Sequence, residues 1–390
     1  MKKINLYAVL VLLTVFTACK QTPEKQTKQH HTPDVTEPAE LSAKAFDTIL
    51  NGEQTGLYWI KNGNIKAAFT NYGGRLVGLW VPAKDSTMTD VVVGFDNVGD
   101  FVTSTEPYFG ATIGRVGNRI AKGQFVLNDR VYHIPVNNGE NTLHGGKKGF
   151  QDVVWKASQP DEHTLVLQYT SPDLEEGFPG ELVVKVTYSL TADDALKMEY
   201  EATTDKPTPV NLTNHAFFNL NGEGSGTVLE HRVKFYADAF TPVDKGLIPT
   251  GEIRKVKGTP FDFTAFHTIG ERIGTDNEQL DNGDGYDHNF VLNGTGGMGM
   301  NHAATIVGDR TGITMDVFTE EPGIQFYSGN FMQGQNTFKS GVKDEYRTAF
   351  ALETQHFPDA PNQPDFPSVI LNPGEKYHTV SVYRFSVSEQ

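Results

Sequence analysis

The feature that most constrains the fold is a pair of strand-like segments joined by a short polar turn. Residues 182–188 are rich in β-branched and aromatic side chains, and residues 196–200 alternate apolar and polar side chains. This pattern predicts an antiparallel hairpin. A second hairpin is predicted where Gln124–Leu127 and Val131–Ile134 flank Asn128-Asp129, because asparagine and aspartate favour tight turns.

Strand-like runs recur through the rest of the chain, whereas helical periodicity is scarce. We expect a helical turn or two at Val98–Val102 and at Ile269–Ile273. The strand–helix alternation of a doubly wound α/β fold is missing from the pattern. Many strands with local connections therefore predict an all-β protein, a large antiparallel β-sandwich or barrel with few short helices. The further runs are Ile65–Phe69, Leu76–Val81, Thr164–Tyr169, Val233–Tyr236, Ile313–Phe318 and Thr379–Phe385.

The N-terminus has the composition of a processing signal rather than of a folded domain. Two lysines precede the apolar run Leu6–Phe16, which is too short for a confident membrane span. The run ends at Ala18-Cys19 and resembles the lipobox of bacterial lipoproteins, in which the cysteine becomes the lipidated first residue. Conventional secretory cleavage near Ala18 is the alternative. Both interpretations predict export, to the periplasm or to a membrane-anchored state.

These signals divide the chain into three parts. Residues 1–18 are the expected signal peptide, and residues 19–41 are lipidated Cys19 plus a disordered tether rich in Thr, Pro, Gln, Lys and Glu. Residues 42–390 are the expected folded domain. Cys19 is the only cysteine, so no intramolecular disulfide can form.

Net charge and motif content exclude several classes of function. The net charge is −15, or −17 once the lysines at positions 2 and 3 leave with the leader. This charge argues against nucleic acids and anionic membrane surfaces as partners, and favours a neutral or cationic small ligand. The sequence has no G-x-G-x-x-G opening a helix, no P-loop and no H-E-x-x-H, so nucleotide and zincin functions have no support. We expect no contact with a membrane except through an N-terminal lipid anchor, and a monomer or a weak dimer.

The segment Asn211–Leu220 combines one imidazole with three asparagines, a threonine and two phenylalanines. Amides and aromatic faces suit a sugar ring, and His215 can exchange protons near neutral pH. A buried strand with a satisfied core histidine is an equally good interpretation of this segment alone. Glu353 follows the apolar run 348–352, where burial would raise its pKa towards the range of a general base. The alternative is a solvated residue on the outer face of a strand.

Three further polar clusters could hold a ligand. Gly114–Ile120 interleaves arginines with glycines, and Asn141–Gly146 places His144 before a glycine pair. Gly283–Phe290 brings a tyrosine, carboxylates and a histidine to the start of an apolar run. A calcium loop is the competing interpretation of the last cluster, but its spacing does not fit an EF-hand and the closing glutamate is missing.

Taken in order, these clusters resemble the aldose 1-epimerase (galactose mutarotase) family. The resemblance extends from about Leu57 to Phe385, and the ordered set is far more specific than any one motif. The motifs are Asn118-Arg119-Ile120, Thr142–Gly146, Asn214-His215, Gly285–Asn289, Glu321–Asn330, Leu352–Gln355 and Leu371–Glu375.

This resemblance implies one β-supersandwich domain with an open cleft and with neither metal nor organic cofactor. It implies interconversion of the α and β anomers of free aldoses such as glucose or galactose, a reaction that feeds hexose metabolism. His215 would be the acid that protonates the ring oxygen, and Glu353 the base that deprotonates the anomeric hydroxyl. Ala216 and Phe217 stand where Ser/Thr and Tyr are frequent in the family, which bears on the sugar preference. The implied substrate-binding residues are Asn118, Arg119, His144, Phe217, Asp287 and Gln325.

Two other functions remain open from the residues alone. A non-catalytic carbohydrate-binding protein would need the aromatic and amide groups but not His215 and Glu353. A glycoside hydrolase would use two carboxylates such as Glu353 and Asp287, and their separation would set the stereochemistry. The retained imidazole–carboxylate pair favours the epimerase over both.

Overall fold

The computed structural model describes residues 41–294 and 299–388. The predicted signal peptide, Cys19 and the predicted tether up to residue 40 lie outside the described residues, so these divisions of the chain stay predictions. None of the described helices has the length and apolar character needed to span a membrane.

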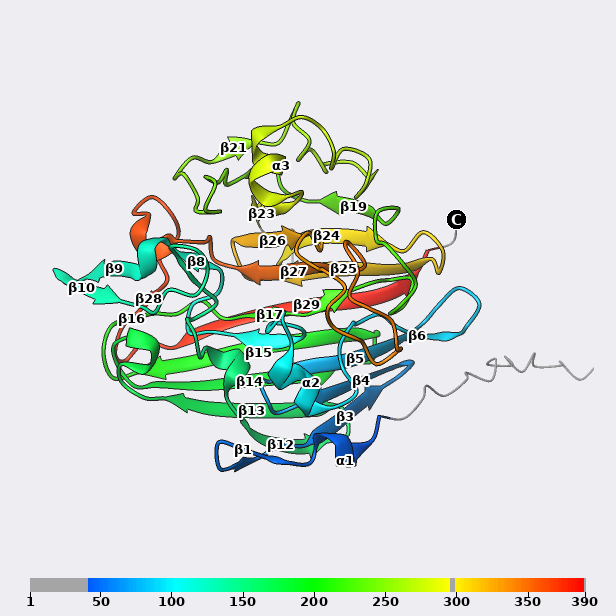
Figure 1. Ribbon diagram of the computed structural model, residues 1–390, viewed down its shortest axis with the longest axis horizontal. Coiled ribbons are helices and arrows are strands. Elements are labelled where there is room, and N and C mark those ends of the chain that lie inside the picture. Colours follow the sequence, from blue (N-terminus) through cyan, green and yellow to red (C-terminus); the bar gives the residue numbers. More distant parts are fainter. Residues whose placement is uncertain (1–40, 295–298, 389–390) are drawn as a thin grey trace, which may run out of the picture. The chain divides into compact units, whose positions relative to one another are not determined.

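The larger sheet has nine strands in the order β12-β13-β14-β15-β29-β25-β24-β19-β22, all antiparallel to their neighbours (Figure 1). The predicted hairpin forms its third and fourth strands, where β14 pairs with β15 from Leu182 opposite Thr204 to Leu190 opposite Leu196. Side chains along β14 alternate between buried and more exposed positions, as expected for a strand with one face on the core. The strands are β12 Lys156–Asp161, β13 Thr164–Ser171, β14 Leu182–Leu190, β15 Ala195–Thr204, β19 Arg232–Phe235, β22 His267–Thr268, β24 Asn301–Val307, β25 Ile313–Thr319 and β29 Tyr377–Val387.

Two smaller sheets pack against this layer. The four-stranded sheet has the order β3-β4-β5-β6, and the six-stranded sheet has the order β18-β27-β26-β23-β20-β21. Their strands are β3 Leu57–Asn62, β4 Ile65–Thr70, β5 Arg75–Pro82, β6 Met88–Asp90, β18 Phe217–Phe218, β20 Ala239–Phe240, β21 Arg254–Lys255, β23 Asp287–Val291, β26 Gly323–Tyr327 and β27 Phe350–Gln355.

Aromatic side chains connect the layers. The ring of Phe69 on β4 lies 4.7 Å from that of Tyr188 on β14, and the ring of Phe235 on β19 lies 4.3 Å from that of Phe290 on β23. All four side chains belong to one buried hydrophobic cluster that extends through both layers. Burial of such large rings is the main driving force for the assembly. The predicted antiparallel β-sandwich is therefore confirmed.

Short two-stranded ladders complete the scaffold. One of them is the second predicted hairpin, in which β9 and β10 pair across Asn128 and Asp129, both with positive φ. The ladder of β17 with β7 has a direct bearing on the site, because β17 carries His215. The ladders are β1 Ile49–Leu50 with β2 Glu53–Gln54, β8 Arg119–Ile120 with β11 Thr142–Leu143, β9 Gln124–Leu127 with β10 Arg130–His133, β7 Ala111–Ile113 with β17 Thr213–His215, and β16 Thr208–Pro209 with β28 Ile370–Leu371.

Helices are short in the described ranges. A helix was predicted at Val98–Val102, and α2 begins there because Asn97 caps it by accepting a hydrogen bond from the Asp100 backbone N–H. The prediction of a helix at Ile269–Ile273 is wrong. Ile269 and Gly270 instead donate backbone hydrogen bonds to residues 231 and 229, which fixes this segment as a turn. The helices are α1 Ala43–Phe46, α2 Val98–Thr103 and α3 Glu278–Gly283, with 3₁₀ turns at Ala121–Gly123, Phe150–Asp152, Glu175–Gly177 and Ala360–Asn362.

Candidate active site

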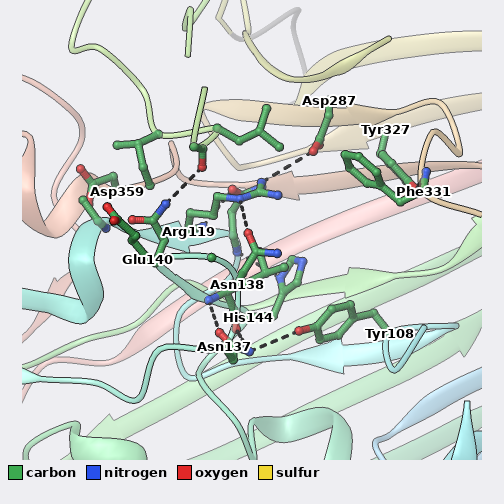
Figure 2. A pocket seen from close by; sticks show the side chains of 18 of the residues that line it. Tyr108, Arg119, Asn137, Asn138, Glu140, His144, Asp287, Tyr327, Phe331 and Asp359 are labelled. Atoms are coloured by element: carbon green, nitrogen blue, oxygen red, sulfur yellow. Dashed lines mark hydrogen bonds and ion pairs between the residues drawn. The ribbon is translucent and has the colours of Figure 1, made fainter. Parts of the chain in front are cut away.

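A cleft of about 1040 Å³ opens at the ends of several strands and loops of the six-stranded sheet region (Figure 2). Its volume is in the range of pockets that hold small molecules. The predicted site residues that line it are Asn118, Arg119, His144, His215, Asp287 and Glu353. Residues from positions 118 to 353 of the chain are thus brought to one cavity.

His215 and Glu353 face each other inside this cleft. His215 ends β17, and Glu353 lies in the middle of β27, which packs beside β17. The His215 Nε2 atom is 3.5 Å from the Glu353 Oε1 atom, and both side chains are almost fully buried. Glu353 Oε2 and His215 Nδ1 have no hydrogen-bond partner among the described residues. Buried polar atoms without a partner are uncommon, and they mark this pair as a candidate functional site.

Burial sets the charge state of this pair. Desolvation lowers the pKa of His215 to about 3. It raises the pKa of Glu353 well above its usual value, an effect that the nearby Asp287 carboxylate reinforces and the Arg119 guanidinium opposes. Between these two pKa values the pair holds one proton. One group can therefore donate a proton while the other accepts one, which is the requirement for coupled acid–base chemistry.

Aromatic rings fix the plane of the His215 imidazole. The rings of Phe217 and Tyr108 stack on it at centroid distances of 4.9 and 5.7 Å, with interplanar angles of 29° and 28°. His144 meets the imidazole edge-on at 5.0 Å. These apolar faces exclude water from the imidazole, which is the physical cause of its lowered pKa.

His144 is held as a hydrogen-bond donor. Its Nδ1 atom accepts a hydrogen bond from the Asn118 backbone N–H at 3.1 Å. In a neutral imidazole the other nitrogen then carries the proton, so the hydrogen-bond network assigns Nε2–H to His144. Burial keeps the ring neutral because it lowers the pKa of His144 well below its usual value.

This tautomer also bears on metal binding. The ligating atoms of His144, His215 and Glu353 lie within 4.8 Å of one another, close enough for a metal centre. A metal needs a free lone pair on each nitrogen ligand. His144 offers no lone pair at Nε2 while Nδ1 accepts from Asn118, so the trio does not fit a metal.

Arg119 and Asp287 form the opposite wall, where Figure 2 shows Arg119 between Asp287 and Asn138. The Arg119 Nη1 atom is 3.6 Å from Asp287 Oδ2, and Arg119 Nε donates to Asn138 Oδ1 at 3.2 Å. Gln325 Nε2 donates to Asp287 Oδ1 at 2.7 Å. The guanidinium is thereby fixed in the cleft with donors left for a ligand.

Phe217 and Gln325 do not line the cleft. Phe217 is fully buried in a hydrophobic cluster behind His215, and Gln325 lies behind Asp287, directly across from Glu353 in the β26–β27 register. The expectation that these two residues contact a substrate is therefore not supported by their positions. Ala216 is also buried, and its backbone N–H donates to Asn214 Oδ1, so the segment 214–217 acts as a support for His215.

Several lining residues were not found from the sequence. They include Glu106, Tyr108 and Tyr327, which lie in a loop or at a strand end. The sequence Glu106-Pro107-Tyr108 has no pattern that marks a ligand site. It joins the cleft because the backbone N–H of Gly110 donates to the carbonyl of His215, which holds this loop beside the imidazole.

Comparisons with known proteins agree with this architecture. The family model described as aldose 1-epimerase matches residues 56–384. The chain is 42% identical over 331 residues to galactose mutarotase from Bos taurus, covering 85% of this chain and 94% of the relative. It is 34% identical over 326 residues to aldose 1-epimerase from Escherichia coli K12, covering 83% and 93%.

A solved structure shows the same fold. The GalM/aldose epimerase homologue from C. elegans superposes with a TM-score of 0.79 at 32% sequence identity, covering 86% of this chain and all of that chain. The residues matched by the family model, 56–384, include all the residues that line the cleft. This chain belongs to the aldose 1-epimerase family.

Proposed function

We propose that this protein is an aldose 1-epimerase that interconverts the α and β anomers of free aldoses such as glucose and galactose. The observation that carries the proposal is the His215–Glu353 pair, one imidazole and one carboxyl group facing each other at 3.5 Å inside the cleft. The membership of the family supports the same activity.

The reaction needs only proton transfers. Glu353 takes the proton from the anomeric hydroxyl while His215 gives a proton to the ring oxygen, so the C1–O5 bond breaks and a free aldehyde forms. Rotation about C1–C2 presents the other face of the carbonyl. Reversal of both transfers closes the ring as the other anomer and restores both groups. Each positioned transfer contributes typically about 10²–10⁴-fold to the rate.

The pair's single proton fits both halves of this cycle. Ring opening starts with the proton on His215, and the open-chain state has it on Glu353. Burial alone favours the second, uncharged arrangement. A bound aldose would donate a hydroxyl hydrogen bond to the Glu353 carboxyl group, and together with the Arg119 guanidinium this contact favours the carboxylate that ring opening requires.

We assign the other predicted site residues to substrate binding or to its support. His144 would donate through Nε2–H, and Arg119 through its guanidinium, to oxygens whose charge increases during ring opening. Asn118 and Asp287 would bond hydroxyl groups. Gln325 and Phe217 would act indirectly, by orienting Asp287 and His215.

Polarimetry tests this function. Freshly dissolved α-glucose and α-galactose should mutarotate faster with the purified protein than in buffer, with no added metal or cofactor. A rate equal to that of buffer would contradict the proposal and leave a carbohydrate-binding protein as the better explanation. Release of monosaccharide from an oligosaccharide would instead favour a glycoside hydrolase, a weaker candidate because Asp287 is already bonded to Arg119 and Gln325.

We further propose that the protein is exported and anchored by a lipid on Cys19, as a monomer or a weak dimer. The lipobox-like sequence before Cys19 supports this proposal. Cells fed a radiolabelled fatty acid should label the wild-type protein but not Cys19→Ser, and the variant should leave the membrane fraction. Equal labelling of both proteins would contradict lipidation at Cys19, and recovery of unlabelled, soluble, cleaved wild-type protein would indicate a conventional leader.

A further inference from the structure

The cleft contains a second incompletely bonded carboxyl group, which the proposed mechanism does not use. Glu106 lines the cleft next to Tyr108 and is partly buried. Its Oε1 atom accepts a hydrogen bond from the Tyr108 backbone N–H at 3.2 Å. Its Oε2 atom has no hydrogen-bond or ion-pair partner in the part of the chain that the structure describes. This oxygen is accessible to solvent, so a cationic group on a ligand can replace water there and pair with the carboxylate.

The Arg75 guanidinium does not bond the Glu106 carboxyl group. Arg75 acts on Glu106 through its charge, but its Nη1 atom donates to the carbonyl of Phe109 at 2.9 Å. Its Nη2 atom donates to the carbonyls of Pro107 and Gln151 at 2.9 and 2.8 Å. All the oxygens that Arg75 bonds therefore belong to the backbone.

Two other carboxyl groups that line the cleft, those of Asp287 and Asp359, already have partners for both of their oxygens. Asp287 is bonded to Arg119 and Gln325. Asp359 accepts hydrogen bonds from the Ala121 backbone and from Asn362. Glu353 is similar to Glu106, because one oxygen of its carboxyl group also has no partner.

The surroundings of Glu106 favour a positively charged group. Burial raises the pKa of Glu106 to about 7, an effect that the Tyr108 backbone N–H and the Arg75 guanidinium oppose and that the carboxylates of Asp344 and Asp287 reinforce. A cation placed beside it would restore the ionised carboxylate. The rings of Tyr108 and Tyr327 also line the cleft, and aromatic rings attract ammonium groups through their faces.

We propose that Glu106 makes the cleft selective by charge, favouring aldoses that carry an ammonium substituent and disfavouring aldoses that carry a carboxylate. This inference rests on the proposed epimerase activity and adds a class of substrate to it. An amino aldose would place its ammonium group against Glu106 Oε2, whereas a uronic acid would place a second negative charge there. The same anomeric chemistry at His215 and Glu353 would act on both.

The test compares kcat/KM by polarimetry at pH 7.5 for four sugars: glucose, 2-amino-2-deoxyglucose, 6-amino-6-deoxyglucose and glucuronate. Glu106→Gln keeps an acceptor for the Tyr108 N–H and removes only the charge. We expect this variant to lower the ratio of the preferred amino sugar to glucose by about tenfold, and to raise the ratio of glucuronate to glucose. The carbon that carries the preferred amine identifies the part of the ring that faces Glu106.

Glu140→Gln is the matched control, because Glu140 is an exposed carboxylate that lines the same cleft. This variant should keep the wild-type ratios, since solvent screens its charge. Unchanged ratios in Glu106→Gln would overturn the inference, and so would an equal loss for all four sugars, which would indicate a hydroxyl contact without charge selection. If the wild type does not accelerate glucose at all, the proposed activity fails instead. Calorimetric binding of the same sugars to the wild type and Glu106→Gln would then still decide the charge selectivity.

Discussion

Glu353→Gln should lower kcat/KM for mutarotation by about 10²–10⁴-fold, the usual contribution of a positioned general base. The amide has nearly the same shape as the carboxylate and keeps an oxygen near His215, but it cannot take a proton from the anomeric hydroxyl. Polarimetry with α-glucose or α-galactose measures the loss. A sugar titration by calorimetry should show that the variant still binds its substrate.

The chain offers a closely matched control for this substitution. Glu321 is also a buried glutamate paired with a histidine, since its Oε2 atom lies 2.6 Å from His356 Nδ1, yet it does not line the cleft. Glu321→Gln should therefore keep a near wild-type rate per folded molecule. If Glu353→Gln retained the wild-type rate, or if both variants lost activity equally, Glu353 would not be the base.

His215→Ala should cause a loss of similar size, about 10²–10⁴-fold in kcat/KM. The substitution removes the group that protonates the ring oxygen, and no other imidazole can replace it. His144 lies close by, but it holds its proton at Nε2 with a strongly lowered pKa. The loss of thermal stability in His215→Ala should be small compared with its loss of activity. The side chain lines a cavity, and His215 Nδ1 makes no hydrogen bond among the described residues.

The double variant His215→Ala/Glu353→Gln tests whether the two groups act together. Ring opening needs both proton transfers, so removing the second group should cost little once the first is gone. The double variant should thus be only slightly slower than either single variant. Fully multiplicative losses would contradict a coupled acid–base pair and would assign the two residues to separate steps.

Much of the fold could be predicted from the sequence because the relevant patterns are local. Alternation within β14 and β15, and two turn-forming residues between β9 and β10, determine hairpins whose partners are adjacent in the chain. The prediction of a helix at Ile269–Ile273 failed because the structure of this segment does not depend on a local pattern. That segment bonds to residues 229 and 231, a distant part of the chain that overrides local preference.

The order of the polar motifs was enough to identify the family, and it named the imidazole and the carboxyl group. The order of the motifs did not show which of these residues face the cleft and which lie behind it. Phe217 follows His215 by two residues along an extended chain, yet it is buried behind the imidazole and does not face the cavity. Glu106 was overlooked because nothing in its neighbours marks it, although it lines the cleft.

The sequence by itself therefore determined the β class, the family and the chemical groups available, since these depend on local pattern and residue type. Only the tertiary structure decided which groups meet. The packing of β17 beside β27 brings His215 to Glu353, and the Asn118 N–H fixes the tautomer of His144. Burial then shifts the pKa values of the pair in opposite directions. These properties arise from contacts between segments far apart in the chain, which no local pattern encodes.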